Sequence, residues 1–284
     1  MQTVKLVECP RDAMQGWPHI IKTTDKVAYL NQLLKVGFDV LDFGSFVSPK
    51  IIPQMADTKE VLPQLQLNSD SAKLLAIVAN TRGASEACAY DEISYLGFPF
   101  SISETFQLRN TNKTIAQSLT EVAEIQDLCL RHHKKLLIYI SMGFGNPYGD
   151  EYSVDLMFDW FRKLAGMGIE VISLADTVGV ANPQIIETAF SNLIPEFPDI
   201  EIGGHFHSTP TTWQDKIEAA FTHGCTHFDS SLKGIGGCPM AKDELVGNIA
   251  TENLVWWLQQ QEVPLTLDMS ALLEATEMAA RIFI

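Results

Sequence analysis

The sequence predicts a (β/α)8 barrel, in which eight parallel strands alternate with helices and close into a ring. Eight short runs rich in β-branched residues recur along the chain, and segments with helical spacing of apolar residues separate them. The length of 284 residues suits one barrel of about 250 residues with an addition. A doubly wound open sheet is the second interpretation, although no GxGxxG motif follows the first run.

The expected strands are bounded by Gly, Pro or polar residues. They cover Val4–Cys9, Val40–Phe43, Leu74–Val78, Glu92–Phe98, Lys135–Ile140, Val171–Leu174, Ile200–Phe206 and His227–Ser230. Helical spacing lies between them, as in Ile115, Leu119 and Val122. Two more helical patterns, near Thr251–Gln260 and Ser270–Ile282, follow the last strand. We interpret them as the eighth barrel helix and an additional C-terminal helix, so residues 1–284 are expected to form a single catalytic domain.

Composition excludes several classes of protein. With Lys+Arg 20 against Asp+Glu 35, the net charge is −15, which argues against binding to nucleic acid. No apolar run approaches the roughly 20 residues that a membrane helix needs, and no leader is visible at Met1. The five cysteines are irregularly spaced, as is typical of reduced thiols. We therefore expect a cytoplasmic protein.

The carboxyl ends of the predicted strands are strongly polar. They carry Arg11, Asp12, Asp42, Asn80, Ser103, Glu104, Ser141, Asp176, Thr177, His205, His207, Asp229 and Ser230. Any one of them alone is more simply explained as a cap or turn residue, and Asp176 before Thr177 fits a plain turn. Because catalytic residues of (β/α)8 barrels gather at this rim, their convergence predicts an active site there.

Two histidines at the end of the seventh strand indicate a metal site. On a strand, residues i and i+2 share a face, so His205 and His207 present two imidazoles to one place. Asp12, across the rim, is a natural carboxylate ligand, and Asn248 offers an amide oxygen. Mixed nitrogen and oxygen ligands favour Mg²⁺ or Mn²⁺, with Co²⁺, Zn²⁺ and Fe²⁺ left open. Two structural histidines are the alternative explanation.

A glycine-rich segment follows the eighth strand and carries one thiol. It reads Gly234-Ile235-Gly236-Gly237-Cys238-Pro239. Glycines make a poor core and a good hinge, so we expect a mobile loop that acts as a lid. A thiol with a pKa near 8.5 can give or take a proton at neutral pH. Cys238 is therefore a candidate catalytic residue.

These residues together resemble the 3-hydroxy-3-methylglutaryl-CoA (HMG-CoA) lyase family of metal-dependent TIM-barrel enzymes. The resemblance runs over nearly the whole chain. Its motifs are Pro10-Arg11-Asp12 with Gln15, Ser45-Phe46-Val47-Ser48-Pro49-Lys50, Asn80-Thr81-Arg82-Gly83, Ser173 to Gly179, His205-Phe206-His207, Asp229-Ser230-Ser231, Gly234 to Pro239, and Gly247-Asn248-Ile249-Ala250-Thr251-Glu252. The Gly-Gly-Cys-Pro loop is the most specific of them.

The resemblance implies a fold, a reaction and a set of site residues. The fold is the TIM barrel, and the reaction is a retro-Claisen cleavage of a 3-hydroxyacyl-CoA into acetyl-CoA and acetoacetate. The implied metal ligands are Asp12, His205, His207 and Asn248. The expected substrate contacts are Gln15, Ser45, Asn80 and Thr177. The family also implies an acyl-CoA as the partner molecule and a homodimer.

Within that reaction, Arg11 would stabilise the thioester enolate as its charge develops. Asp12, Asp42 or Asp176 would remove the hydroxyl proton, and Cys238 would protonate the carbanion. Asp42 stands where the family usually has Glu. Two alternatives stay open, a Claisen-condensing synthase of the same superfamily and a non-catalytic acyl-CoA-binding barrel. Synthases of this class usually have a longer C-terminal region.

Overall fold

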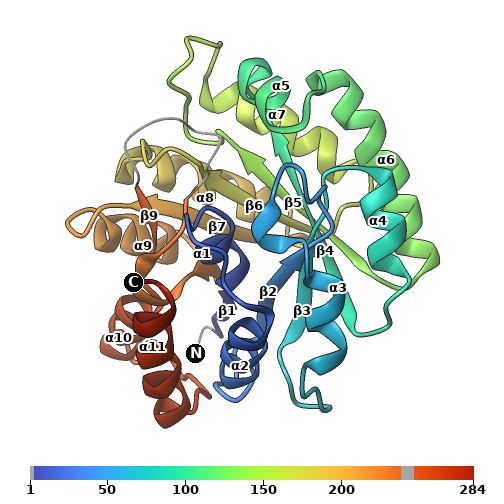
Figure 1. Ribbon diagram of the computed structural model, residues 1–284. Helices are drawn as coiled ribbons and strands as arrows, with labels where there is room; N and C mark the ends of the chain where they lie inside the picture. Colours follow the sequence, from blue (N-terminus) through green and yellow to red (C-terminus); the bar gives the residue numbers. More distant parts are fainter. Residues whose placement is uncertain (1–2, 238–245) are drawn as a thin grey trace.

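Eight parallel strands form a closed ring in the computed structural model, which describes residues 3–237 and 246–284 (Figure 1). The strands are β1 (Lys5–Glu8), β2 (Val40–Ser45), β3 (Lys73–Ile77), β4 (Ile93–Ser101), β5 (Lys135–Ser141), β6 (Val171–Asp176), β7 (Glu201–Ser208) and β8 (His227–Ser230). Neighbours in sequence pair with each other, and β8 pairs with β1 to close the ring. This closure confirms the TIM barrel and excludes the open sheet.

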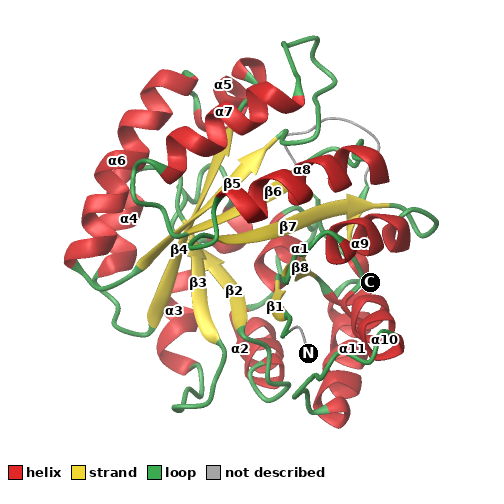
Figure 2. Cartoon of the chain, turned by 180° about the vertical axis from the view of Figure 1, so that it is seen from behind, coloured by secondary structure: helices red, strands yellow, loops and turns green. Residues whose placement is uncertain are grey.

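Helices surround the ring on all sides (Figures 1 and 2). They are α1 (Pro10–Gln15), α2 (Thr23–Leu33), α3 (Thr58–Val61), α4 (Thr81–Cys88), α5 (Glu104–Thr111), α6 (Ile115–Arg131), α7 (Val154–Ala165), α8 (Pro183–Glu196), α9 (Trp213–Thr222), α10 (Thr251–Gln260) and α11 (Met269–Ile282). Short 3₁₀ turns cover Pro53–Met55, Leu62–Gln64 and Leu232–Gly234. The predicted additional helix is α11, which packs against α2. None of the helices in the described residues is long and apolar enough to span a bilayer.

Several strands run further toward the rim than the sequence predicted. β2 continues through Gly44 and Ser45, which pair with Ala76 and Ile77 of β3. Asp42 therefore lies inside β2, fully buried, and not at its end as expected. The sequence misplaced it because Gly and Ser usually end a strand rather than extend one.

A short ninth strand, β9 (Gly247–Asn248), was not predicted. It pairs antiparallel with the end of β7, so that Asn248 lies opposite His207. Two residues give no periodicity, so a strand of this length has no signal in the sequence. Its position matters because it brings the loop after β8 back to the histidines.

The core has two parts. The larger lies between the ring and its helices, where apolar side chains of the strands and of the helices pack together. The smaller lies inside the ring and alternates along the strands, with Val7 and Cys9 on β1 and Leu137 and Tyr139 on β5. Inward-facing residues thus follow the period of two expected of strands. Polar residues share this interior with them, and they build the site.

Candidate active site and metal centre

A six-residue helix, α1, sets Arg11 and Asp12 at the mouth of the barrel. Pro10 takes the first helical position, where its missing N–H is not needed and its fixed φ favours the turn. Asp12 lies in the first turn, where a negative charge suits the helix dipole. Both side chains are buried, with 8% of Arg11 and 6% of Asp12 exposed.

The two histidines lie side by side at the end of β7, as the spacing predicted. Their ring centroids are 5.2 Å apart. His205 Nδ1 is 2.9 Å from Asp229 Oδ2, and His207 Nδ1 is 2.8 Å from the carbonyl oxygen of Thr177. Since carbonyl and carboxylate oxygens accept, each Nδ1 carries the hydrogen and each Nε2 keeps its lone pair.

This arrangement fits a divalent cation. One ligand atom from each of Asp12, His205 and His207 falls within 4.8 Å of the others. His207 Nε2 is buried and has no hydrogen-bond partner among the described residues. An unpaired buried nitrogen of this kind is what a metal-binding imidazole presents before the ion binds. A carboxylate with two imidazoles is a donor set that divalent transition metals and Mg²⁺ accept.

Asn248 joins the cluster through β9. Its Nδ2 donates to Asp12 Oδ2 at 2.7 Å and to the Ile235 carbonyl at 2.9 Å, so the amide oxygen Oδ1 is the atom that could bind a cation. A Cβ at Gly236 would come within 2.4 Å of Asn248 Nδ2 and 2.9 Å of Asp12 Oδ2. Glycine is therefore required at 236, where φ is +114°.

The electrostatics favour the ligating form of Asp12 and of His207. Burial would raise the pKa of Asp12, but Arg11 and the two imidazoles bring it below its usual value, so the carboxylate is anionic. Burial and the neighbouring His205 lower the pKa of His207, which favours its neutral form. For His205, burial is outweighed by Asp229, and the pKa is raised.

Arg11 is held rigidly by two carboxylates. Its Nε and Nη2 contact Asp42 Oδ2 at 2.9 and 2.6 Å, and its Nη1 donates to Asp12 Oδ1 at 3.1 Å. Burial raises the pKa of Asp42 to about 6, against the opposing effect of Arg11. The guanidinium is thus fixed beside the histidines, with its donors already oriented.

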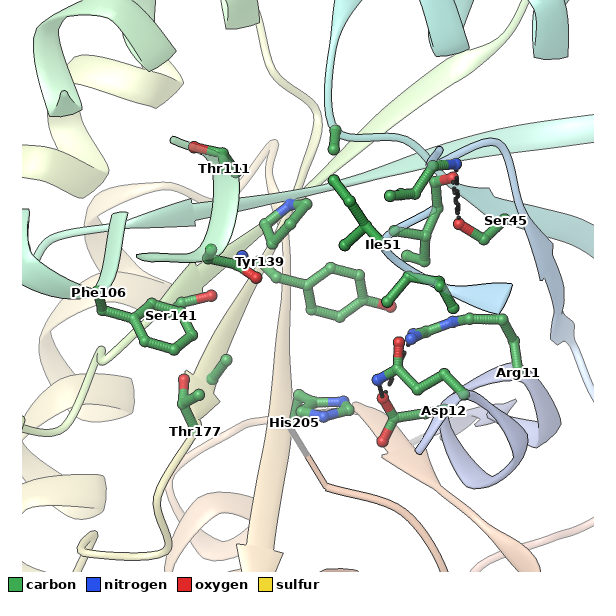
Figure 3. Close-up of a pocket in the computed structure, with 18 of the residues that line it drawn as sticks. Arg11, Asp12, Ser45, Ile51, Phe106, Thr111, Tyr139, Ser141, Thr177 and His205 are labelled. Atoms are coloured by element: carbon green, nitrogen blue, oxygen red, sulfur yellow. Dashed lines mark hydrogen bonds and ion pairs between the residues drawn. The ribbon is translucent and has the colours of Figure 1, made fainter. Parts of the chain in front are cut away.

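A cavity of about 130 Å³ opens over this cluster. Figure 3 shows Arg11 and Asp12 on one side of it and Phe106, Ser141 and Thr177 on the other. The full lining is Arg11, Asp12, Gln15, Ser45, Val47, Ile51, Ile52, Ile77, Ala79, Pro99, Phe106, Asn110, Thr111, Tyr139, Ser141, Ala175, Thr177, His205 and His207. Its walls are mostly apolar, and polar groups lie on both sides of it.

Three of the four expected substrate contacts line this cavity. Gln15 donates to Asp12 Oδ1 at 2.6 Å, Ser45 accepts from the backbone of Val47, and Thr177 accepts from that of Met142. The fourth, Asn80, lies elsewhere. Its side chain accepts from Gly83 N at 2.8 Å and caps α4. Its contact with substrate stays a prediction, and the structure gives its side chain a local structural partner.

Asp176 also lies outside the lining. Its Oδ2 accepts from Lys216 Nζ at 2.6 Å, and its Oδ1 accepts from the backbone N–H of Ala181 at 3.0 Å. Lys216 is buried and also donates to the carbonyl oxygens of Gly179 and His207. The pair thus joins the loop after β6 to the strand that carries the histidines. Cys238, the predicted acid, lies outside the described residues.

Tyr139 is one of several residues of the lining that were not predicted as site residues. Tyr139 extends its ring across the cavity, edge-on to His205 with centroids 5.5 Å apart (Figure 3). Its hydroxyl is buried and has no hydrogen-bond partner among the described residues, and burial raises its pKa well above the usual value. It therefore remains a proton donor. The sequence did contain one indication of its position. Tyr139 lies two residues before Ser141, so both side chains point to the same face of β5.

The fold and this cluster define the class of protein, a TIM barrel with a candidate metal centre at its carboxyl rim. Residues 4–279 match a family model described as HMGL-like. The Bacillus subtilis hydroxymethylglutaryl-CoA lyase YngG is 33% identical over 276 residues, which cover 94% of this chain and 89% of that protein. The Pseudomonas aeruginosa 3-hydroxy-3-isohexenylglutaryl-CoA/hydroxy-methylglutaryl-CoA lyase is 33% identical over 273 residues, 96% and 90% of the two chains.

Solved structures agree with this. The crystal structure of the Bacillus subtilis HMG-CoA lyase has a TM-score of 0.92 at 32% identity, covering 99% of this chain and 94% of the other. An Acinetobacter baumannii HMG-CoA lyase in complex with coenzyme A and 3-methylmalate has a TM-score of 0.91 at 31% identity, covering 99% and 91%. The chain belongs to the HMGL-like family, whose members are carbon–carbon lyases. The synthase and the non-catalytic barrel are not favoured.

Proposed function

We propose that this protein is a divalent-metal-dependent lyase that cleaves HMG-CoA into acetyl-CoA and acetoacetate. The observation that carries the proposal is the convergence of Asp12, His205 and His207 beside the fixed guanidinium of Arg11. The names of its relatives support the substrate. Mg²⁺ or Mn²⁺ is the proposed ion, held by these three residues and Asn248.

The reaction needs a base, a group for the developing negative charge and an acid. When bound, the cation supplies Lewis acidity that lowers the pKa of the C3 hydroxyl. Asp12 is the proposed base, because it alone among Asp12, Asp42 and Asp176 lines the cavity and its lowered pKa keeps it anionic. As the C2–C3 bond breaks, its electron pair forms the thioester enolate.

Arg11 faces that charge with donors that need no reorganisation, because Asp42 and Asp12 already orient them. A proton from Cys238 to C2 then completes acetyl-CoA, and acetoacetate is the second product. We propose that the loop bearing Cys238 closes over the cavity. The mostly apolar walls exclude water from the enolate.

A second cavity, of about 490 Å³, supports recognition of the CoA portion. Trp17, His19, Lys22 and Arg281 are among its lining residues. Its lining includes Asp25 as well, and the cations Lys22 and Arg281 suit the phosphates of CoA. We propose this cavity as the nucleotide site. A cytoplasmic location and a homodimer are further parts of the proposal, the latter checked by light scattering.

One assay tests the activity. The protein is incubated with Mg²⁺ or Mn²⁺ and a panel of 3-hydroxyacyl-CoA thioesters, including HMG-CoA and 3-hydroxy-3-isohexenylglutaryl-CoA, and acetyl-CoA is followed by mass spectrometry. We expect metal-dependent acetyl-CoA with a matched β-keto acid. Absence of product from every thioester, with the ion bound, would overturn the proposed function.

A further inference from the structure

Beneath His205, the interior of the barrel holds a column of charged side chains. Glu201 faces inward on β7 four residues before His205, and His227 and Asp229 face inward on β8. Asp229 Oδ2 accepts from His205 Nδ1, and Asp229 Oδ1 lies 3.3 Å from His227 Nε2. His227 Nδ1 contacts Glu201 on its other side, so that one imidazole bridges two carboxylates.

The column continues to the opposite mouth of the ring. Glu201 accepts from Lys5 Nζ at 2.8 and 3.0 Å, and Lys5 in turn contacts the Tyr95 hydroxyl at 3.2 Å. Lys5 pairs with His227 in the register of β1 and β8. Positive and negative groups alternate along the whole column. Barrel interiors are ordinarily filled by bulky branched apolar residues, so this filling is a departure that calls for a reason.

Space for the imidazole is created by a neighbouring glycine. Gly203 is the β7 residue that pairs with His227, and a Cβ there would lie 2.9 Å from His227 Cδ2 and 3.0 Å from Cγ. Real Cβ contacts are longer, so the ring occupies the room that a side chain at 203 would need. Gly203 and His227 therefore form a matched pair, and His227 has a single well-defined place.

The bridging imidazole is charged. Burial lowers the pKa of His227, but hydrogen bonds and charge from Asp229 and Glu201 outweigh it and raise the pKa to about 9. Burial likewise opposes the ionisation of Glu201, yet His227 and Lys5 bring its pKa to about 2. At neutral pH, His227 is thus a cation, with Nδ1 hydrogen-bonded to Glu201 and Nε2 within ion-pair distance of Asp229.

We propose that His227 and Glu201 are positioning residues that act through Asp229 on the metal ligand His205. The His227 cation lies 3.3 Å from Asp229 Oδ1, and this attraction favours the carboxylate orientation that places Oδ2 at His205 Nδ1. That contact fixes the imidazole in the Nδ1–H tautomer and turns its Nε2 toward Asp12 and His207. Without His227, Asp229 is a buried carboxylate free to rotate, and His205 loses its fixed orientation. The inference rests on the metal centre of the proposed function.

Binding of Mn²⁺ alone, by isothermal titration calorimetry, tests the inference without the lyase reaction. His227→Leu fills the space but donates nothing, and we expect its Kd for Mn²⁺ to rise roughly tenfold or more, as loss of outer partners of metal-bound histidines does. His227→Gln restores one N–H toward Asp229 and should recover part of the affinity. His223→Leu, on the outer end of α9, is the matched control and should bind as the wild type does.

A second readout separates positioning from general loosening of the fold. Two-dimensional ¹⁵N spectra of the histidine rings, assigned with His205→Ala, report which nitrogen of His205 carries hydrogen. We expect Nδ1–H in the wild type and in His227→Gln, and a tautomer mixture in His227→Leu. If His227→Leu does not fold, Glu201→Gln replaces it, because Glu201 lies at the partly exposed end of the column and its loss should weaken binding by a smaller factor.

Unchanged Mn²⁺ affinity together with an unchanged His205 tautomer, in a folded variant of the column, overturns the inference. So does Mn²⁺ binding that survives His205→Ala. A wild-type protein that binds Mn²⁺ through His205 but cleaves no thioester overturns the proposed lyase function, and the column variants still decide the inference by affinity. The two failures are therefore distinguishable.

Discussion

The guanidinium of Arg11 and the carboxylate of Asp42 form a forked ion pair inside the barrel, with Nη2–Oδ2 at 2.6 Å and Nε–Oδ2 at 2.9 Å. Asp42 is fully buried, and Arg11 is the partner that satisfies it. One edge of the guanidinium, formed by Nε and Nη2, binds Asp42, and this contact fixes the orientation of the Arg11 side chain. Nη1 donates to Asp12 Oδ1, and Arg11 lines the cavity, which suits a group that must stabilise charge without moving.

Replacing Arg11 tests its place in the reaction. Arg11→Met should lower kcat by about 10²- to 10³-fold, because about 3–4 kcal/mol of enolate stabilisation is lost. Arg11→Lys should recover little, since an ammonium cannot reproduce the fork. Steady-state kinetics measure this, with Arg82→Met on the exposed surface as control. Near-normal turnover of folded Arg11→Met would remove Arg11 from the mechanism.

The thiol of the loop gives a separate prediction. Cys238→Ser should slow turnover by about 10²-fold or more, because a hydroxyl is a far weaker acid than a thiol at neutral pH. Mn²⁺ binding should be unchanged, since sulfur is not among the proposed ligands. Cys88→Ala, on α4 away from the cavity, is the control. A loss of Mn²⁺ in Cys238→Ser would show that the thiol serves the ion instead.

Lys216 lies outside the lining of the cavity, but its buried ion pair with Asp176 should contribute strongly to the stability of the fold. Lys216→Met leaves Asp176 buried without its cation, which costs about 3–5 kcal/mol of unfolding free energy. Adding Asp176→Asn should recover part of that loss, because the amide still accepts from Ala181. Urea denaturation measures both. Lys59→Met breaks an exposed pair with Glu86 and should change stability by less than about 1 kcal/mol.

Glu8 makes stability depend on pH. Burial raises its pKa from 4.5 to about 8, so the folded protein holds a proton that the unfolded chain releases. The Glu8 contribution to the free energy of unfolding is therefore greatest below about pH 4.5 and falls as the pH rises to about 8. The change is on the order of 3 kcal/mol between about pH 5.5 and 8.

The variant Glu8→Gln should remove this slope, because the amide can still accept from Leu232 N–H and donate to Thr251. Denaturation curves at several pH values should show that the free energy of unfolding of Glu8→Gln increases relative to that of the wild type as the pH rises. Glu60→Gln, on the exposed surface, should keep the wild-type profile. Parallel pH profiles for Glu8→Gln and wild type would contradict the assignment.

The alternation of strands and helices was sufficient to predict the ring and its polar rim. His205 and His207 were placed correctly because their spacing alone determines a shared face. The sequence did not predict which way the side chains at the other strand ends point. Asn80 and Asp176 look like their neighbours on the rim, yet Asn80 caps a helix and Asp176 pairs with Lys216, 40 residues further along the chain.

The interior of the ring was predicted least well. Strands buried on both faces read as continuous apolar runs, so inward and outward residues look alike. Tyr139 had only its spacing from Ser141 as a signal, and the Glu201–His227 contact had none. Only the register between β7 and β8, which places Gly203 beside His227, brings these groups together. This pairing register is fixed only when the ring closes, so it cannot be read from the sequence of either strand alone.

Asp12 and Asn248 are hydrogen-bonded although 236 positions separate them along the chain. No early fragment of a growing chain can hold both. The ion-binding pocket is consequently among the last features to form during synthesis, after β8 has met β1 and the returning strand has docked. Retention of a bound ion thus reports completed folding, and a nick between β8 and β9 would release it while most helices stayed intact.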